Sequence, residues 1–275
     1  DSPYRYNWQA PILLSKHNQD ILYMGANKLL RSMDKGETFE TISADLTTGG
    51  KKGNVPFGTI TAISESPFQF GYIYVGSDDG YVNVTTNSGG SWTRISDNLP
   101  QELWVSRVIA SQHEKERVFV TLNGYRSDDF KPYVFVSENN GATWKNISSN
   151  LSNFPVNVIK EDPKDEAILY VGTDNGVYVS FDKGGSWQEF SSGLPKVAVH
   201  DLVIQNEEND LVIGTHGRSI YKANIAPLQQ FNTIKDKPVT IFEIPEIKHS
   251  SRWGSSWSQW AEVNESKISI PFYVS

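Results

Sequence analysis

One segment of eight residues occurs four times in this chain and limits the possible folds more than any other feature. Each copy starts with Ser or Thr, has Asp or Asn third and Gly fifth, and closes with Trp or Phe. The copies are Ser32–Phe39, Thr85–Trp92, Ser137–Trp144 and Ser180–Trp187. Their starts are 53, 52 and 43 residues apart. A repeat of about this length indicates an array of similar structural units.

Strand-like segments surround each copy of the octet. The strand directly before it is predicted at Leu22–Gly25, Ile73–Gly76, Val118–Thr121 and Leu169–Gly172, with a fifth at Leu211–Gly214 that has no octet after it. An earlier strand is predicted at Pro11–Leu14, Thr59–Ser64, Val105–Ala110, Val156–Lys160 and Val199–Ile204. With the strand after the octet, each unit has four strands joined by tight turns. The prediction is an all-β chain of about five β-propeller blades.

The octet itself predicts a hairpin with a self-bonded turn. Its third residue can fold its side chain back onto loop N–H groups, and its fifth supplies a positive φ as Gly. The closing aromatic is expected to fill the core of its own blade. Because the octet recurs in every blade while a site occurs once, its third residues are interpreted as structural rather than catalytic. These are Asp34, Asn87, Asn139 and Asp182.

Composition excludes several classes of function. The formal net charge is −7 with acids and bases interspersed, which argues against nucleic-acid partners. The chain has no Cys, so disulfides and thiolate metal sites are excluded, and we expect neither a metal nor a cofactor. It has no apolar run long enough to insert into a membrane. These features are compatible with a secreted or cell-surface protein, such as one of the bacterial envelope.

The chain resembles large secreted bacterial proteins with Asp-box (BNR) repeats, which are labelled sortilin-like or "glycosyl hydrolase". The resemblance covers nearly the whole chain and implies that it corresponds to a second propeller followed by the start of an immunoglobulin-like domain. Besides the octets, the segments that carry it are Tyr6–Trp8, Gly25–Asn27, Gly53–Thr61, Trp104–Val108, Asn123–Tyr133, Val156–Ile159, His200–Val203 and Gly214–Arg218.

The predicted domain organisation is residues 1–224 as blades and residues 225–275 as a tail without the repeat. Propellers of this type usually have more than five blades. We therefore expect other segments or chains to complete the ring, or a partner to cover an open arc. Ile268–Val274 is interpreted as the first strand of the next domain.

Polar residues recur on the innermost strand of the blades. Aligning the five strands on their apolar residues puts Ala10, Thr61, Arg107, Asn157 and His200 at one position. Buried polar groups must be hydrogen-bonded or hydrated, so these residues predict a polar hub. Two interpretations stay open: the side chains bond neighbouring strands and fix the blade register, or they contact a ligand.

The remaining ligand-binding candidates lie near the same end of the blades. Asp201, His216 and Arg218 belong to the fifth blade, and the insertion at Tyr125–Tyr133 adds Tyr125, Arg126, Asp128 and Asp129. Neighbouring strand residues face opposite ways, so His200 and Asp201 are not expected to pair with each other. No Ser occupies a nucleophile-elbow context. We therefore assign no catalytic residue.

Two functions remain open at this point. The first is a secreted module that binds a protein, peptide or glycan. The alternative is a glycoside hydrolase of the xyloglucanase or sialidase type, which needs two carboxylates about 5–10 Å apart. Its candidates are Asp128, Asp129 and Asp201, of which no pair is singled out by spacing.

Overall fold

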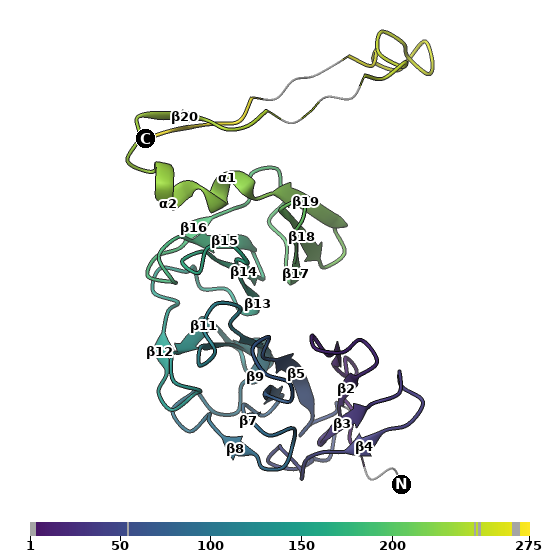
Figure 1. Ribbon diagram of the computed structural model, residues 1–275, viewed down its shortest axis with the longest axis vertical. Coiled ribbons are helices and arrows are strands. Elements are labelled where there is room, and N and C mark those ends of the chain that lie inside the picture. Colours follow the sequence, from purple (N-terminus) through teal and green to yellow (C-terminus); the bar gives the residue numbers. More distant parts are fainter. Residues whose placement is uncertain (1–3, 54, 245, 247–248, 266–269) are drawn as a thin grey trace. The chain divides into compact units, whose positions relative to one another are not determined.

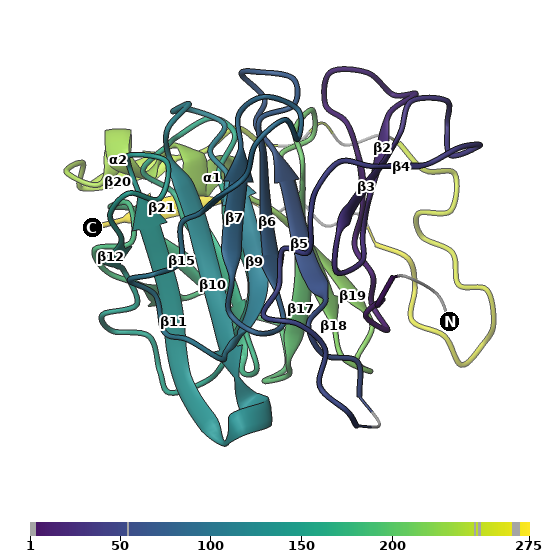
Figure 2. The ribbon, with the colours of Figure 1, turned by 90° about the horizontal axis from the view of Figure 1, so that it is seen from below.

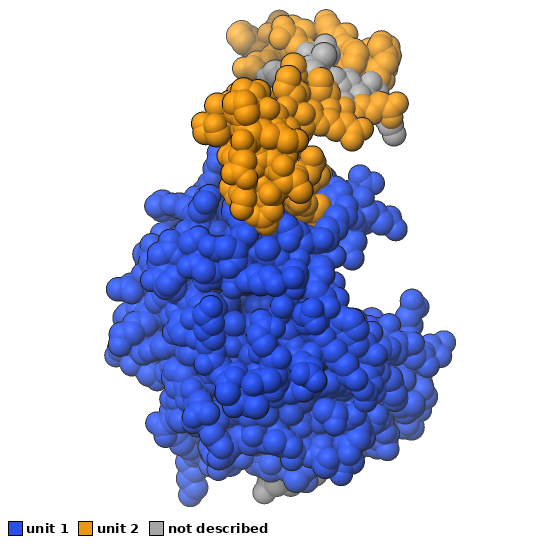
Figure 3. Space-filling view, turned by 60° about the vertical axis from the view of Figure 1, so that its left-hand side comes forward, with its two compact units in different colours: residues 1–223 blue, residues 224–275 orange. Residues whose placement is uncertain are grey.

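Strands form nearly all the regular structure of the residues that the structure describes. The computed structural model describes residues 4–53, 55–244, 246, 249–265 and 270–275. Clustering of the contacts divides the chain into two compact units, residues 1–223 and 224–275, shown separately in Figure 3. Among the described residues, no helix is long and apolar enough to span a membrane.

Unit 1 contains five antiparallel sheets that succeed one another along the chain and form an open arc (Figure 1). We number these sheets as blades 1 to 5. Blade 1 consists of β1 (Ile12–Leu14), β2 (Leu22–Gly25), β3 (Leu29–Ser32) and β4 (Glu40–Thr41). Blade 2 consists of β5 (Ile60–Glu65), β6 (Ile73–Ser77), β7 (Val82–Thr85) and β8 (Thr93–Arg94). Blade 3 consists of β9 (Trp104–Ala110), β10 (Val118–Gly124), β11 (Asp129–Ser137) and β12 (Lys145–Asn146).

The last two blades differ in strand number. Blade 4 consists of β13 (Val156–Glu161), β14 (Leu169–Thr173), β15 (Gly176–Ser180) and β16 (Gln188–Glu189). Blade 5 has only β17 (Val199–Gln205), β18 (Asp210–Thr215) and β19 (Ile220–Asn224). The all-β class and the five blades are thus confirmed, and the missing fourth strand matches the missing octet.

Three short helices interrupt the strand pattern and were not expected from the sequence. The 3₁₀ turn η1 (Tyr125–Ser127) lies in the insertion of blade 3. Helices α1 (Ala226–Gln229) and α2 (Phe231–Ile234) belong to unit 2 and have no side-chain cap. Unit 2 also contains the pair β20 (Val239–Ile241) and β21 (Phe272–Val274). Residues 268–269 of the expected next-domain strand lie outside the described residues, and a following immunoglobulin-like domain stays a prediction.

Each octet forms the same self-bonded hairpin. In the first, Asp34 accepts hydrogen bonds from the Thr38 amide at 2.9 Å and the Thr38 hydroxyl at 2.6 Å. These bonds, helped by one from the Ser32 hydroxyl, lower the pKa of Asp34 to about 2. Gly36 has φ of 93°, and Lys35 before it also has a positive φ of 62°. The side chain of Asp34 is therefore engaged within its own turn.

The closing aromatics do not fill their own blades, which corrects the sequence-based expectation. The indole Nε1 of Trp92, Trp144 and Trp187 donates to the carbonyl oxygen of Ile42, Ile95 and Ile147, at 2.9, 2.7 and 2.6 Å. Each of these isoleucines belongs to the preceding blade. Only 4% of Trp187 is exposed, whereas 43% of Phe39 is exposed in blade 1, before which the structure has no blade. Equivalent places in the repeat are thus unequally buried.

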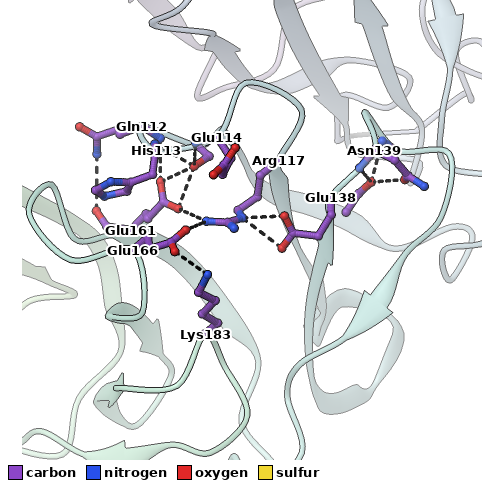
Figure 4. A network of polar contacts seen from close by, with 12 residues as sticks. Gln112, His113, Glu114, Arg117, Glu138, Asn139, Glu161, Glu166 and Lys183 are labelled. Carbon is purple, nitrogen blue, oxygen red and sulfur yellow. Dashed lines mark hydrogen bonds and ion pairs between the residues drawn. The ribbon is translucent and has the colours of Figure 1, made fainter. Parts of the chain in front are cut away.

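A buried ion network joins blades 3 and 4 (Figure 4). Arg117, 6% exposed, contacts Glu138, Glu161 and Glu166 at 2.8, 3.4 and 2.8 Å. Burial alone would lower the pKa of Arg117, but its hydrogen bonds to Glu166 and Glu138 outweigh burial and raise it. Glu161, the buried acid of the network, also accepts from the Ser111 hydroxyl, so its charge has the further hydrogen bonds that a buried ion pair requires. Glu138 and Glu166 are partly exposed.

The unequal burial of the closing aromatics predicts unequal costs of truncation. We expect Trp187→Ala to destabilise the chain by about 3–5 kcal/mol, because it leaves a cavity between two blades. Phe39→Ala is expected to change the free energy of unfolding by about 0.5 kcal/mol or less, as for other exposed positions. Chemical denaturation of both variants measures the difference, and equal losses would contradict the interblade role.

The lowered pKa of Asp34 predicts a pH-dependent contribution to stability. A depressed folded-state pKa gives stability that is present above pH ~4, the unfolded value, and is lost as the pH falls through about 2. Asn occupies the same place at Asn87 and Asn139, so Asp34→Asn preserves the hairpin without the titration. Between pH 4 and 2 the wild type should lose stability relative to this variant. If the melting temperatures of the wild type and Asp34→Asn changed in parallel with pH in thermal unfolding, this effect would be excluded.

Candidate functional site

A cavity of about 940 Å³ lies at one end of the inner strands of unit 1. It contains seven of the ten ligand-binding candidates: Tyr125, Arg126, Arg107, Asn157, His200, Asp201 and His216. Asp128, Asp129 and Arg218 are not among its lining residues. The other lining residues are Gln9, Pro11, Thr61, Ala62, Ile63, Trp104, Ser106, Val108, Asn123, Asp174 and Ala198.

A β-bulge in the inner strands of blades 2 to 5 defines the hub position and corrects the sequence alignment in blade 3. The register skips one residue at Thr61 in β5, at Asn157 in β13 and at His200 in β17. In β9 the skipped residue is Ser106, because Val105 pairs with Leu122 and Arg107 with Thr121. Ser106 therefore occupies the hub position that the sequence alignment gave to Arg107.

The bulged residues tie each blade to the next. Thr61 Oγ1 donates to the carbonyl of Val105 at 2.7 Å, and Ser106 Oγ donates to that of Val156 at 2.8 Å. Asn157 Nδ2 reaches the carbonyl of Val199 at 3.2 Å. For these three residues, the contacts favour the interpretation that hub side chains bond neighbouring strands and fix the blade register, rather than contact a ligand.

A second polar position lies at the end of β6, β10, β14 and β18, and of its four residues the sequence analysis singled out only His216. In each blade, the first residue after the bulge pairs with a residue of the second strand. The second polar position lies two residues beyond that partner, and it is occupied by Asp78, Asn123, Asp174 and His216. Asn123 Nδ2 donates to Asn157 Oδ1 at 2.7 Å, and Asn157 Nδ2 donates to Asp174 Oδ1 at 2.8 Å. The signal in the sequence is the Asp that opens each of two similar turns, Asp78–Gly80 and Asp174–Gly176, but an Asp at this place usually serves the turn itself.

Arg107 extends from blade 3 to blade 5. Its Nη2 lies 3.0 Å from Asp201 Oδ1 and 3.1 Å from the carbonyl oxygen of His200, while Nη1 donates to the Ser106 carbonyl at 2.9 Å. About a third of the side chain is exposed. The guanidinium is thus held in place on the cavity wall and still accessible.

Two histidines face each other on the blade 5 side of the cavity. The rings of His200 and His216 lie 5.3 Å apart between centroids. Reduced solvation on the cavity wall lowers the pKa of His200, and the charges of His216 and Arg107 lower it further. The charge of Asp174 raises this pKa but does not outweigh the other causes. His200 is therefore neutral near pH 7 and can donate or accept a hydrogen bond.

The insertion of blade 3 forms a projecting hairpin with an aromatic tip (Figure 2). The Arg126 guanidinium lies 4.0 Å from the ring centroid of Trp104, a cation–π contact on the cavity wall. Tyr125 packs edge-on against Phe130 at 5.9 Å. Asp129 accepts a hydrogen bond from the Tyr133 hydroxyl, and Asp128 has a positive φ of 55°. The two acids shape the hairpin, while Arg126 and Tyr125 face the cavity.

The arrangement is suited to binding an anionic or polar ligand. Among the residues with described positions, no group of three or more His, Cys, Asp or Glu side chains is arranged to hold a metal. The acids that line the cavity are Asp174 and Asp201, and each is bonded to a neighbouring side chain.

Comparison with solved structures identifies the fold. Similar structures include an ancestral GH74 enzyme (17% identity, TM-score 0.60) and the GH74 xyloglucanase of Xanthomonas campestris (17%, 0.62). A third is described as the extracellular domain of a one-component system of B. thetaiotaomicron (19%, 0.53). The matches cover 78%, 78% and 74% of this chain but only 28%, 36% and 26% of those chains. This chain thus spans about a third of their length.

These similarities and the four Asp-box hairpins define a β-propeller of the BNR type. Residues 132–259 match the family model described as Sortilin-Vps10 (sortilin, neurotensin receptor 3). The resemblance to sortilin-like Asp-box propellers is therefore confirmed, by the family model over residues 132–259 and in fold by the solved structures. No curated protein matches the chain.

The histidine pair predicts a coupled titration. In His216→Gln, the pKa of His200 should rise, because one of the charges that disfavour its protonation is removed. NMR titration of the His200 ring in both proteins measures the shift. His113→Gln, in the turn after β9 and outside the cavity lining, is the matched control and should leave the His200 pKa unchanged. An unchanged pKa in His216→Gln would show that the rings are uncoupled.

Proposed function

We propose that this chain is a binding module that holds an anionic group of a peptide, protein or glycan in the cavity at the end of its inner strands. The observation that carries the proposal is Arg107, whose guanidinium is fixed by Asp201 and two carbonyls yet accessible. A guanidinium held in this way keeps N–H groups of Nε and Nη1 for a ligand, and a carboxylate or sulfate that displaces Asp201 can form two parallel hydrogen bonds.

The charges around the cavity support an anionic ligand. The chain as a whole carries a formal charge of −7, yet Arg107 and Arg126 line the cavity. Lys160 lies close enough to Asp201 and Arg107 for their charges to act on its pKa, which burial lowers. The aromatic faces of Trp104 and Tyr125 add apolar surface beside these cations. Such a surface fits a ligand that combines an acidic group with an apolar or sugar-ring portion.

The comparisons support the proposed class of partner and its place outside the cell. The matching family model is described as a neurotensin receptor, which supports a peptide, and two similar propellers are GH74 enzymes, which supports a glycan. A third is an extracellular domain, which supports a secreted or cell-surface location. Because the chain spans only part of these propellers, we further propose that other segments or chains complete the ring.

Two substitutions at the Arg107–Asp201 pair test the proposal. Arg107→Lys keeps the charge but loses the planar fork, and should weaken binding of a peptide with a free terminal carboxylate by about 1–3 kcal/mol. Asp201→Asn should strengthen binding, because it frees the guanidinium from its internal partner. Calorimetric titration measures both, with the amidated peptide and a sulfated oligosaccharide as comparison ligands.

Arg94→Lys, a surface change outside the cavity, is the matched control and should bind like the wild type. If Arg107→Lys binds every ligand as tightly as the wild type does, Arg107 only connects blades 3 and 5 and the proposal fails.

Glycoside hydrolysis is the alternative function, favoured by one observation. Asp174 and Asp201 both line the cavity, beside Trp104, as a hydrolase of this fold would require of two carboxylates. Reducing ends released from xyloglucan by the chain, and lost in both Asp174→Asn and Asp201→Asn, would favour this alternative over a binding module.

A further inference from the structure

Three boundaries between blades use the same docking contact. At each, the closing Trp of one octet donates to an Ile carbonyl of the blade before it. The Gly of the same octet also lies against that Ile: a Cβ added at Gly89, Gly141 or Gly184 would come within 2.4–2.7 Å of it. The contact therefore requires a bare Gly and an aromatic on one side and an aliphatic residue on the other.

Blade 1 presents the same half of this contact with nothing against it. A Cβ added at Gly36 would meet no atom within 4 Å, and Phe39 is 43% exposed. Ile12 and Leu14 are 66% and 57% exposed, while Leu13 between them packs into the core shared with blade 2. Since side chains alternate along a strand, Ile12 and Leu14 lie on the face opposite that core. The edge formed by Ile12, Leu14, Gly36 and Phe39 is here called the blade 1 edge.

The blades alternate in pairs, which indicates what kind of blade fits this edge. Glu65 of blade 2 accepts from the Ser15 hydroxyl of blade 1 at 2.6 Å, and Glu161 of blade 4 accepts from Ser111 of blade 3 at 2.8 Å. In the same two pairs, His17 and His113 contact carbonyls of the following blade. Blade 1 is thus the counterpart of blade 3, and Leu14 stands where Ala110 stands.

Blade 3 is preceded by blade 2, so the blade 1 edge matches a blade of that type. At this boundary Ile95 receives Trp144, and the amide of Ala110 donates to Ser64 Oγ at 2.9 Å. A second copy of this chain cannot supply the contact end to end, because blade 5 has no fourth strand to carry the aliphatic residue.

We infer that the blade 1 edge is the docking surface for a further Asp-box blade of the blade 2 type, supplied by polypeptide outside this chain. That blade carries an aliphatic residue at the place of Ile95 and a Ser at the place of Ser64. It covers Gly36 and Phe39 as blade 2 covers Gly141 and Trp144. This inference does not depend on what binds in the cavity.

The absence of Cys from the chain allows a direct test. A copy of its own residues 58–103, which carries blade 2, is joined by a short flexible linker to the N-terminus of the full chain. Leu14→Cys introduces a single thiol in both the plain and the extended chain, and it leaves Gly36 and Phe39 in place. Leu14 is 57% exposed, whereas its counterpart Ala110 is only 5% exposed under blade 2. The reaction of this thiol with Ellman's reagent should slow by about tenfold or more in the extended chain, because a short linker supplies the blade at an effective concentration in the mM range.

Two matched controls accompany this measurement. Ile95→Asp in the added copy alone should restore fast reaction, because it removes the aliphatic side of the contact. A thiol at Lys145→Cys, on the exposed strand β12, should react equally in all proteins.

Amide hydrogen exchange establishes whether the added copy folds. Protection of its strands together with protection of the thiol supports the inference. A protected copy with a fully reactive thiol at residue 14 overturns it. An unprotected copy overturns it as well, since a blade with the required residues would then have failed to fold onto the edge.

Discussion

The contact between each closing Trp and the Ile carbonyl of the blade before it holds this arc of blades together. Three such contacts, with an octet Gly against the same Ile, set the spacing of successive blades. The bulged hub residues add a second tie at the inner end, as Thr61 does to the carbonyl of Val105. Because both ties connect neighbouring blades, the fold is a stack of pairwise interfaces, and the cavity lies where the inner ends of the blades meet.

The local structure could be predicted well from the sequence, because it depends on short-range chemistry. The octet specifies its own hairpin, since Asp34 and Thr38 are four residues apart and bond each other. The blade against which each closing aromatic packs could not be predicted, because this contact depends on a neighbouring blade rather than on the octet itself. Phe39 and Trp187 occupy the same place in the repeat, yet one is half exposed and the other buried, and only the presence of a preceding blade distinguishes them.

The candidate site was predicted in its location and partly misassigned in its residues. Seven candidates do line one cavity. The alignment of Arg107 with Thr61 failed because a β-bulge leaves no mark in an apolar pattern, and Ser106 and Arg107 are both polar. The one-residue shift matters for function: Ser106 performs the register tie, so Arg107 is available to cross the hub toward Asp201. Asp174 and Asn123 were missed for a different reason. Asp and Asn at the end of a strand usually serve the following turn alone, so their sequence context did not indicate a contact in the cavity.

The two ends of the inner strands carry different chemistry, and this division explains how a repeat can hold a site. At one end Arg117, Ser111 and Glu161 form a buried network whose loss would leave unpaired charges between blades 3 and 4. At the other end of the same strands the groups line the cavity and are only partly buried, and Arg107 and Asn157 are each held by three hydrogen bonds. Substitutions at the accessible end therefore change what the cavity binds at small cost to the stack, whereas the buried end tolerates little change. A propeller of this type can thus change the residues at its cavity without a new fold, and the proposed role of Arg107 in binding concerns only the accessible end.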